Sequence, residues 1–260
     1  MMDRRSLTRA AALGLVALAS AACSDSSGPD GAAEARVTLS LAVPVASGGT
    51  AQAAPGPAGV FSQTDGQNTL EITRVAMVVR EVELERMFEG DCMNSGPGDD
   101  DGCEEFEVGP FLLELPLDDG FEAVFSIDVP EGTYDEVEFD IHKPSDDTAD
   151  DLAFLNQHPD FTDVSIRVEG TYNGEPFVFL QDTNDEQERA LQPPLVVGPD
   201  TGPVNVTLDI DISTWFRRSD GTLIDPMTAN KNGENENLVE NNIRNSIDAF
   251  EDDDRDGDRD

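Results

Sequence analysis

The chain has 260 residues, 38% of them hydrophobic and 27% charged, which is enough apolar material for one real core and too much for a wholly disordered chain. It carries 16 Lys and Arg against 55 Asp and Glu, a formal net charge of −39. Such a charge repels phosphate backbones and argues against nucleic acid as a partner, while it is consistent with either high solubility or a cation-collecting surface.

The N-terminus has the pattern of a secretory signal. Residues 1–22 begin with a basic segment, continue with a short apolar run and end in small residues before Cys23. The apolar run is too short to span a bilayer, so we expect residues 1–22 to be a cleaved signal peptide. Cys23 resembles the cysteine at which bacterial lipoproteins are cleaved and acylated. Leu18 lies two places earlier than that pattern favours, so simple cleavage near Ala21 or Ala22 is the alternative.

A lipid on Cys23 would attach the protein to a membrane. Ser24 follows the cysteine, and in lipoproteins of similar type this position favours the outer membrane. Residues 23–35 are mainly Ser, Gly, Asp and Ala and predict a flexible tether. We therefore expect a lipid-anchored protein of the bacterial cell envelope.

The cysteine count supports this expectation. Cys92 and Cys103 flank a short loop, and an exported chain enters an oxidising compartment in which they can form a disulfide. Cys23 is then the odd thiol, and acylation accounts for it.

Strand patterns occupy most of residues 36–212. Residues 36–45 alternate strictly between apolar and polar side chains, and residues 46–66 predict a Gly/Ala/Pro loop. In residues 69–88 the apolar side chains alternate along the chain, but they switch twice between even-numbered and odd-numbered positions. Such a switch predicts a β-bulge or a sharp bend. Asn173-Gly174 is a strong hairpin signal. Further strands are expected at 106–117, 121–129, 134–142, 164–172, 176–181 and 203–212.

Three stretches, LEITRVAMVVREVEL, FLLELPL and VPEGTYDEVEFDI, resemble a β-sandwich domain of unknown function that recurs in bacterial surface lipoproteins. The resemblance covers roughly residues 36–212 and includes a turn at Gly132, Thr133 and Tyr134 that enters a strand. Transthyretin-like and carbohydrate-binding-like sandwiches use similar turns. The resemblance implies a β-sandwich fold and a location at the bacterial surface, and it implies no catalytic residues.

The C-terminus combines a helix pattern with an acidic run. Residues 237–250 place Val239, Ile243, Ile247 and Phe250 on one helical face, which predicts a short amphipathic helix. Residues 251–260 form an acidic tail. Within that tail the weak calcium candidates are Asp252, Asp254, Asp256 and Asp258, with Gly257 at the sixth position of an EF-hand-like loop. The chain ends before the bidentate twelfth ligand, so a solvated tail is the other interpretation.

No catalytic motif is present. The two histidines, His142 and His158, lack the close pairing of a zinc site, and no Gly-x-Ser-x-Gly elbow or phosphate-cradling loop occurs. Trp215 and Phe216 either close one end of the sandwich or form a ligand platform.

We therefore expect a mainly β protein, an antiparallel β-sandwich over residues 36–250 that ends in a short amphipathic helix. The expected function is that of a non-catalytic cell-envelope lipoprotein, either structural or ligand-binding. Its partners would be the membrane, through Cys23, and an envelope protein or glycan, with no cofactor beyond weakly bound calcium. The alternatives are a calcium- or carbohydrate-binding adhesion module and a carboxylate-dependent hydrolase.

Overall fold

The computed structural model describes residues 34–42, 59–87, 103–106, 109–117, 121–198 and 204–252. The elements of the first half are β1 (Glu34–Ala42), β2 (Phe61–Thr64), β3 (Thr69–Arg86), β4 (Cys103–Phe106), β5 (Phe111–Glu114), β6 (Phe121–Pro130) and β7 (Gly132–Ile141). Those of the second half are α1 (Ala149–Gln157), η2 (Pro159–Phe161), β8 (Ile166–Tyr172), β9 (Glu175–Gln181), β10 (Asp185–Val197), β11 (Val204–Ile210), η3 (Ile212–Thr214), η4 (Pro226–Ala229), α2 (Glu236–Arg244) and β12 (Ile247–Glu251).

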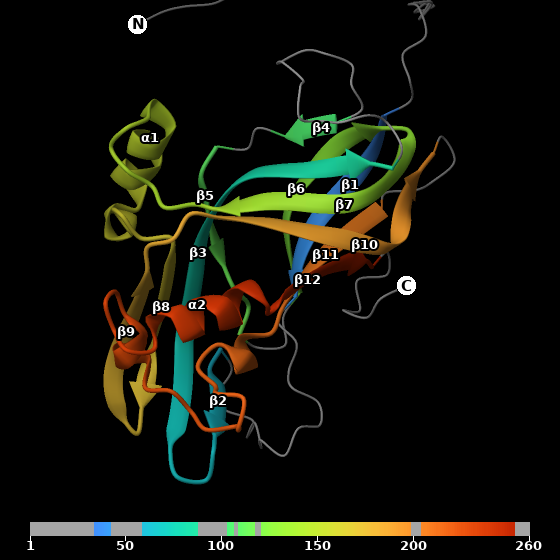
Figure 1. Ribbon diagram of the computed structural model, residues 1–260. Coiled ribbons are helices and arrows are strands. Elements are labelled where there is room, and N and C mark those ends of the chain that lie inside the picture. The colour runs from blue at the N-terminus through green and yellow to red at the C-terminus, as the bar shows by residue number, and fades with distance from the viewer. Residues whose placement is uncertain are drawn as a thin grey trace, which may run out of the picture. The chain divides into compact units, whose positions relative to one another are not determined.

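The described strands form two sheets (Figure 1). The larger, eight-stranded sheet has the order β10-β7-β3-β8-β9, and β2, β4 and β5 also pair with β3. The smaller sheet has the order β12-β11-β1-β6, and its β1–β11 pair is parallel whereas its other pairs are antiparallel. One hydrophobic core contains inward-facing residues of both sheets, such as Val206 of β11 and Phe139 of β7. The expected mainly β, antiparallel sandwich with a short C-terminal helix is confirmed.

Strand β3 has register shifts at the places where its apolar residues switch between even-numbered and odd-numbered positions. Its register shifts at Thr73 and again at Glu81, where φ is 49°. Each shift lets the next apolar run face the core. The residues so buried are Leu70, Ile72, Val75, Met77, Val79, Val82 and Leu84. The predicted bulge is therefore confirmed, and β3 has a third register shift with β7, between Glu85 and Arg86.

The β8–β9 hairpin follows its turn signal. Asn173 and Gly174 have φ values of 53° and 82°, and Tyr172 pairs with Glu175 across the turn. Two consecutive positive φ values are the backbone of a type I′ turn, whose twist matches that of the flanking strands. The local sequence is sufficient to predict this element.

The C-terminal segment differs from the expectation. Helix α2 ends at Arg244, and Ile247–Glu251 forms β12 on the edge of β11 instead of continuing the helix to Phe250. Arg189 of β10 donates hydrogen bonds to the backbone oxygens of Arg244 and Ile247 at 2.7 and 2.6 Å. The backbone of β11 and the side chain of Arg189 thus bind this segment as a strand, although its apolar residues also fit a helical pattern.

Other elements also depart from the sequence pattern. Strand β2 lies within the expected loop 46–66, and β10 and α1 lie in segments for which no element was expected. The sequence of β10 is charged and contains Pro193-Pro194, and its register with β7 shifts between Ala190 and Leu195. Proline has no backbone N–H to donate to a neighbouring strand, so a segment with two prolines does not look like a strand in the sequence. No helix in the described ranges has the length and apolarity needed to cross a membrane.

Candidate functional site

The outer face of the larger sheet carries a set of glutamates that we call the acidic face. Strand pairing aligns Glu83 of β3 with Glu138 of β7, and Glu138 with Glu188 of β10. Because side chains alternate along a strand, the residues between these glutamates point into the core and are buried. The members of the acidic face are Glu83, Glu85, Glu136, Glu138, Glu186 and Glu188.

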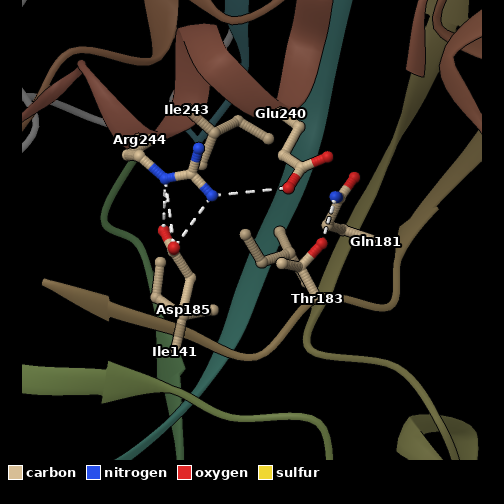
Figure 2. A pocket seen from close by; sticks show the side chains of 8 residues that line it. Ile141, Gln181, Thr183, Asp185, Glu240, Ile243 and Arg244 are labelled. Carbon is tan, nitrogen blue, oxygen red and sulfur yellow. Dashed lines mark hydrogen bonds and ion pairs between the residues drawn. The ribbon is translucent and has the colours of Figure 1, made fainter. Parts of the chain in front are cut away.

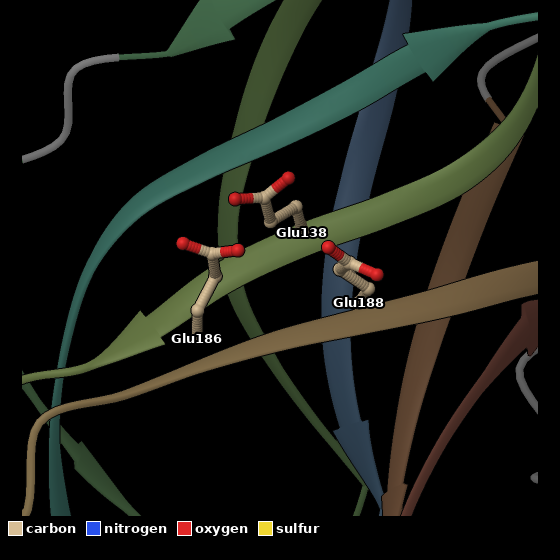
Figure 3. A group of neighbouring side chains, drawn as sticks. All are labelled: Glu138, Glu186 and Glu188. Atoms are coloured by element: carbon tan, nitrogen blue, oxygen red, sulfur yellow. The ribbon is translucent and has the colours of Figure 1, made fainter.

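Three of these carboxylates converge. Figure 3 shows Glu138 on β7 beside Glu186 and Glu188 on β10, and one oxygen of each lies within 4.8 Å of the others. Within the described residues, no ion pair or side-chain hydrogen bond reaches these three carboxylates. Like charges directly opposite one another on neighbouring strands destabilise a sheet, so this arrangement has an electrostatic cost.

The acidic face raises carboxyl pKa values. Partial burial, followed by the charges of Glu186 and Glu83, raises the pKa of Glu138 to about 7. Burial, together with the charges of Glu85 and Glu188, also raises the pKa of Glu136. Burial is the main cause of both shifts and the neighbouring glutamates add to it, so these two carboxyls ionise less readily than a free glutamate.

The geometry suits a hard divalent cation. Calcium binds oxygen ligands at 2.3–2.6 Å, so two oxygens of one coordination shell lie at most about 5 Å apart. The convergent oxygens of Glu138, Glu186 and Glu188 meet that condition. Three convergent carboxylates can supply the oxygen ligands that such an ion prefers.

Sequence reasoning missed this cluster, although a signal exists. Glu83 and Glu85, Glu136 and Glu138, and Glu186 and Glu188 each form a Glu-x-Glu pair within a strand. In an alternating strand such a pair projects from one face. Only the register of β3, β7 and β10 brings the three pairs together.

Most of the site residues expected from the sequence lie outside the described ranges. This holds for Cys23, Cys92, Asp254, Asp256 and Asp258, so the lipid anchor, the disulfide and most of the acidic tail stay predictions. Cys103 is the first residue of β4, in a backbone pairing with Glu85.

Asp252, the expected first position of the calcium loop, is completely buried. Its carboxylate accepts a hydrogen bond from Thr207 Oγ1 at 3.0 Å, and its backbone N–H donates to the oxygen of Asn205 at 3.0 Å. The folded body therefore reaches at least Asp252, beyond the expected boundary at residue 250. A calcium loop that used this carboxylate would have to give up its contact with β11.

Trp215 and Phe216 have no exposed surface. Trp215 Nε1 donates a hydrogen bond to Ser246 Oγ at 2.7 Å, and Phe216 makes edge-to-face contacts with Phe177 and Phe179. A ring without exposed area cannot stack on a ligand. The alternative of an aromatic platform at these two residues is therefore incompatible with their placement, and both close the core.

A small cavity lies between α2 and the larger sheet (Figure 2). Its volume is about 10 Å³, which is room for a single water. Arg244 donates to both carboxylate oxygens of Asp185 at 2.8 and 2.9 Å and lies 3.4 Å from Glu240. The cavity is thus part of the attachment of α2 to β10 and not a ligand site.

Comparisons with protein-family models, with curated proteins and with solved structures found no significant match to this chain.

Proposed function

We propose that the protein is a non-catalytic ligand-binding β-sandwich of the bacterial cell envelope, and that its acidic face binds a divalent cation, with calcium as the favoured ion. The observation that carries the proposal is the convergence of Glu138, Glu186 and Glu188, whose carboxylates form no ion pair or side-chain hydrogen bond with the described residues.

Without a bound ion, the three glutamates repel one another. Side chains directly opposite on paired strands interact by about 0.2–1 kcal/mol, with an unfavourable sign for like charges. Here Glu138 faces Glu83 on one side and Glu188 on the other. A bound divalent ion reverses that sign, because each carboxylate then contacts a positive charge. Open clusters with few protein ligands correspond to the weak, extracellular range of calcium affinity, roughly 0.1–1 mM.

The cellular location in this proposal is inferred from the sequence alone. The signal-like residues 1–22 and Cys23 support a lipoprotein of the outer membrane, with residues 23–35 as a tether. Intact-mass analysis of the membrane-extracted protein should find acylated Cys23 at its N-terminus. A free thiol at that residue would contradict the anchor and leave the cation proposal standing.

Calcium titration calorimetry on the full mature chain tests the cation site. Glu138→Gln should weaken binding about tenfold, because it removes the central carboxylate, which is one of the few protein ligands. Glu175→Gln is the matched control, since Glu175 is an exposed glutamate at the β8–β9 turn, and it should bind as the unmodified protein does.

The acidic tail is the competing calcium site, and a truncation separates the two. The chain should be cut after Asp252, because Asp252 is buried against Thr207. Binding that survives this truncation and falls in Glu138→Gln supports the acidic face. Binding that is lost on truncation and unchanged in Glu138→Gln would place the site in the tail and overturn the proposal.

A further inference from the structure

Helix α1 covers part of the outer face of the larger sheet. On β3, Ala76 and Val78 point away from the main core and pack with Phe154, Phe161 and Val164 in a second apolar cluster. The helix begins at Thr148, whose Oγ1 accepts a hydrogen bond from the backbone N–H of Asp151. The position of α1 is therefore set by apolar contacts below the helix and by a polar cap at its start.

A cleft of about 560 Å³ opens beside α1, within the size range of small-molecule sites. Pro110, Phe111, Leu112 and Phe154 supply its apolar surface. Its polar lining comes from Asp150 and Gln157 of α1 and from His158, the residue that follows the helix. The cleft thus has an apolar body and a polar edge.

A second compartment of about 210 Å³ adjoins the first, and the two share Gly109, Pro110 and Asp150. The other residues that line it are Arg80, Glu81, Thr148 and Asp151. Arg80 is already bound, at 3.1 Å from Asp140 and 3.4 Å from Glu81. The carboxylates of Glu81, Asp150 and Asp151 therefore outnumber the cation, and this end of the cleft is negative.

Asp151 is a rigid part of that negative end. Its side chain is buried, its Oδ1 lies 2.7 Å from His142 Nε2, and its Oδ2 accepts the backbone N–H of Ser145 at 3.0 Å. Among the residues that the structure describes, none forms a hydrogen bond with the buried His142 Nδ1. Both oxygens of the Asp151 carboxylate are thus engaged within the protein, and Asp151 is a fixed part of the wall of the cleft.

We propose that the joined cleft binds a ligand with a cationic head group and an apolar body, such as an arylalkylammonium ion. The ammonium group would pair with the exposed carboxylate of Asp150, and the apolar part would cover Phe111 and Leu112. Charge complementarity carries this choice. Glu81 and Asp151 already have partners in Arg80 and His142, but they add negative charge beside Asp150, and an anionic ligand would meet that charge in a chain of net charge −39.

Binding of 2-phenylethylammonium to the full chain tests the proposal against its neutral isostere, 2-phenylethanol. Amide chemical shifts measured in a titration should change at residues 109–112 and 148–158. The amine should bind about fivefold more tightly than the alcohol, the factor expected of an ion pair at a partly exposed site. Equal affinities for the two compounds, or shift changes elsewhere on the protein, would overturn the proposal.

Two variants sharpen the test. Asp150→Asn removes an exposed carboxylate from both compartments and should abolish most of the preference for the amine. Asp146→Asn alters an exposed aspartate that does not line the cleft and should leave the preference unchanged. An equal loss in both variants would indicate attraction by net charge alone and would contradict a site. Glu138→Gln should not change amine binding. The proposal of an amine site and the proposal of a divalent-cation site can therefore be refuted independently.

Discussion

Thr207 Oγ1 donates a hydrogen bond to Asp252 Oδ2 at 3.0 Å, and neither side chain has any exposed surface. Asn205 Nδ2 in turn donates to Thr207 Oγ1 at 2.9 Å, and the backbone of Asp252 donates to the oxygen of Asn205. The residue after β12 is therefore bound to β11 by its backbone and by its side chain. Residues that look like the start of an acidic tail belong to the folded body.

The first prediction concerns that contact. Asp252→Ala should lower the free energy of unfolding by about 1–3 kcal/mol, because it leaves the buried hydroxyl of Thr207 without this acceptor. Urea denaturation measures the change. Asp146→Ala, at an exposed aspartate, is the control and should unfold as the unmodified protein does. An unchanged midpoint for Asp252→Ala would show that the carboxylate is not held in the core.

The second prediction follows from the pKa of Glu138, which burial and neighbouring glutamates raise from 4.5 to about 7. A carboxyl group with a raised pKa favours folding while it is protonated, so its contribution is lost as the pH rises from about 4.5 through 7. Glu138→Gln should therefore raise the melting temperature at pH 8 and change it little at pH 4. After allowance for solvent screening, the gain at pH 8 is about 1 kcal/mol or less.

Calorimetric melting at both pH values measures this difference, with Glu175→Gln as the control. High salt should reduce the gain, because mobile ions screen the repulsion among the glutamates. A stabilisation of equal size at pH 4 and pH 8 would contradict the electrostatic origin.

The third prediction concerns the backbone contact at a bulge. A Cβ atom on Gly170 of β8 would lie 1.9 Å from the carbonyl oxygen of Glu71 on β3, beside the register shift at Thr73. Gly170→Ala should therefore cost about 1–3 kcal/mol or more, because the strands must separate to admit the methyl group. Gly198→Ala has open space around its Cβ and should be nearly neutral. Urea midpoints of the two variants would be compared, and equal stability would refute the close approach of β3 and β8.

The fourth prediction concerns the attachment of α2. Arg244 binds both carboxylate oxygens of Asp185, and a lysine keeps the charge while it loses the two-point geometry. Arg244→Lys and Arg244→Ala should both destabilise the protein, by about 0.5–1 kcal/mol. Lys231→Ala breaks the exposed ion pair with Asp182 and should have no measurable effect. A lysine variant as stable as the unmodified protein would show that charge alone holds the helix.

Local patterns predicted those elements whose conformation depends on neighbours in the sequence. The two switches of β3 between even-numbered and odd-numbered apolar positions and the Asn173-Gly174 turn are visible in short stretches, and both occur in the structure. The pattern failed at Ile247–Phe250, where a strand and a helix bury the same apolar residues equally well. There the free hydrogen-bonding groups of β11 decide the outcome, and they are distant in the sequence.

The candidate sites show the same division. The alternation of each strand, and with it the pairing of Glu136 with Glu138 on one face, follows from the sequence alone, because side-chain direction in a strand has a period of two residues. The convergence of Glu138 with Glu186 and Glu188, and the cleft between α1 and β5, follow only from the tertiary structure. The physical reason is that strand register and helix docking depend on hydrogen bonds and apolar contacts between segments separated by tens of residues, which no local pattern specifies.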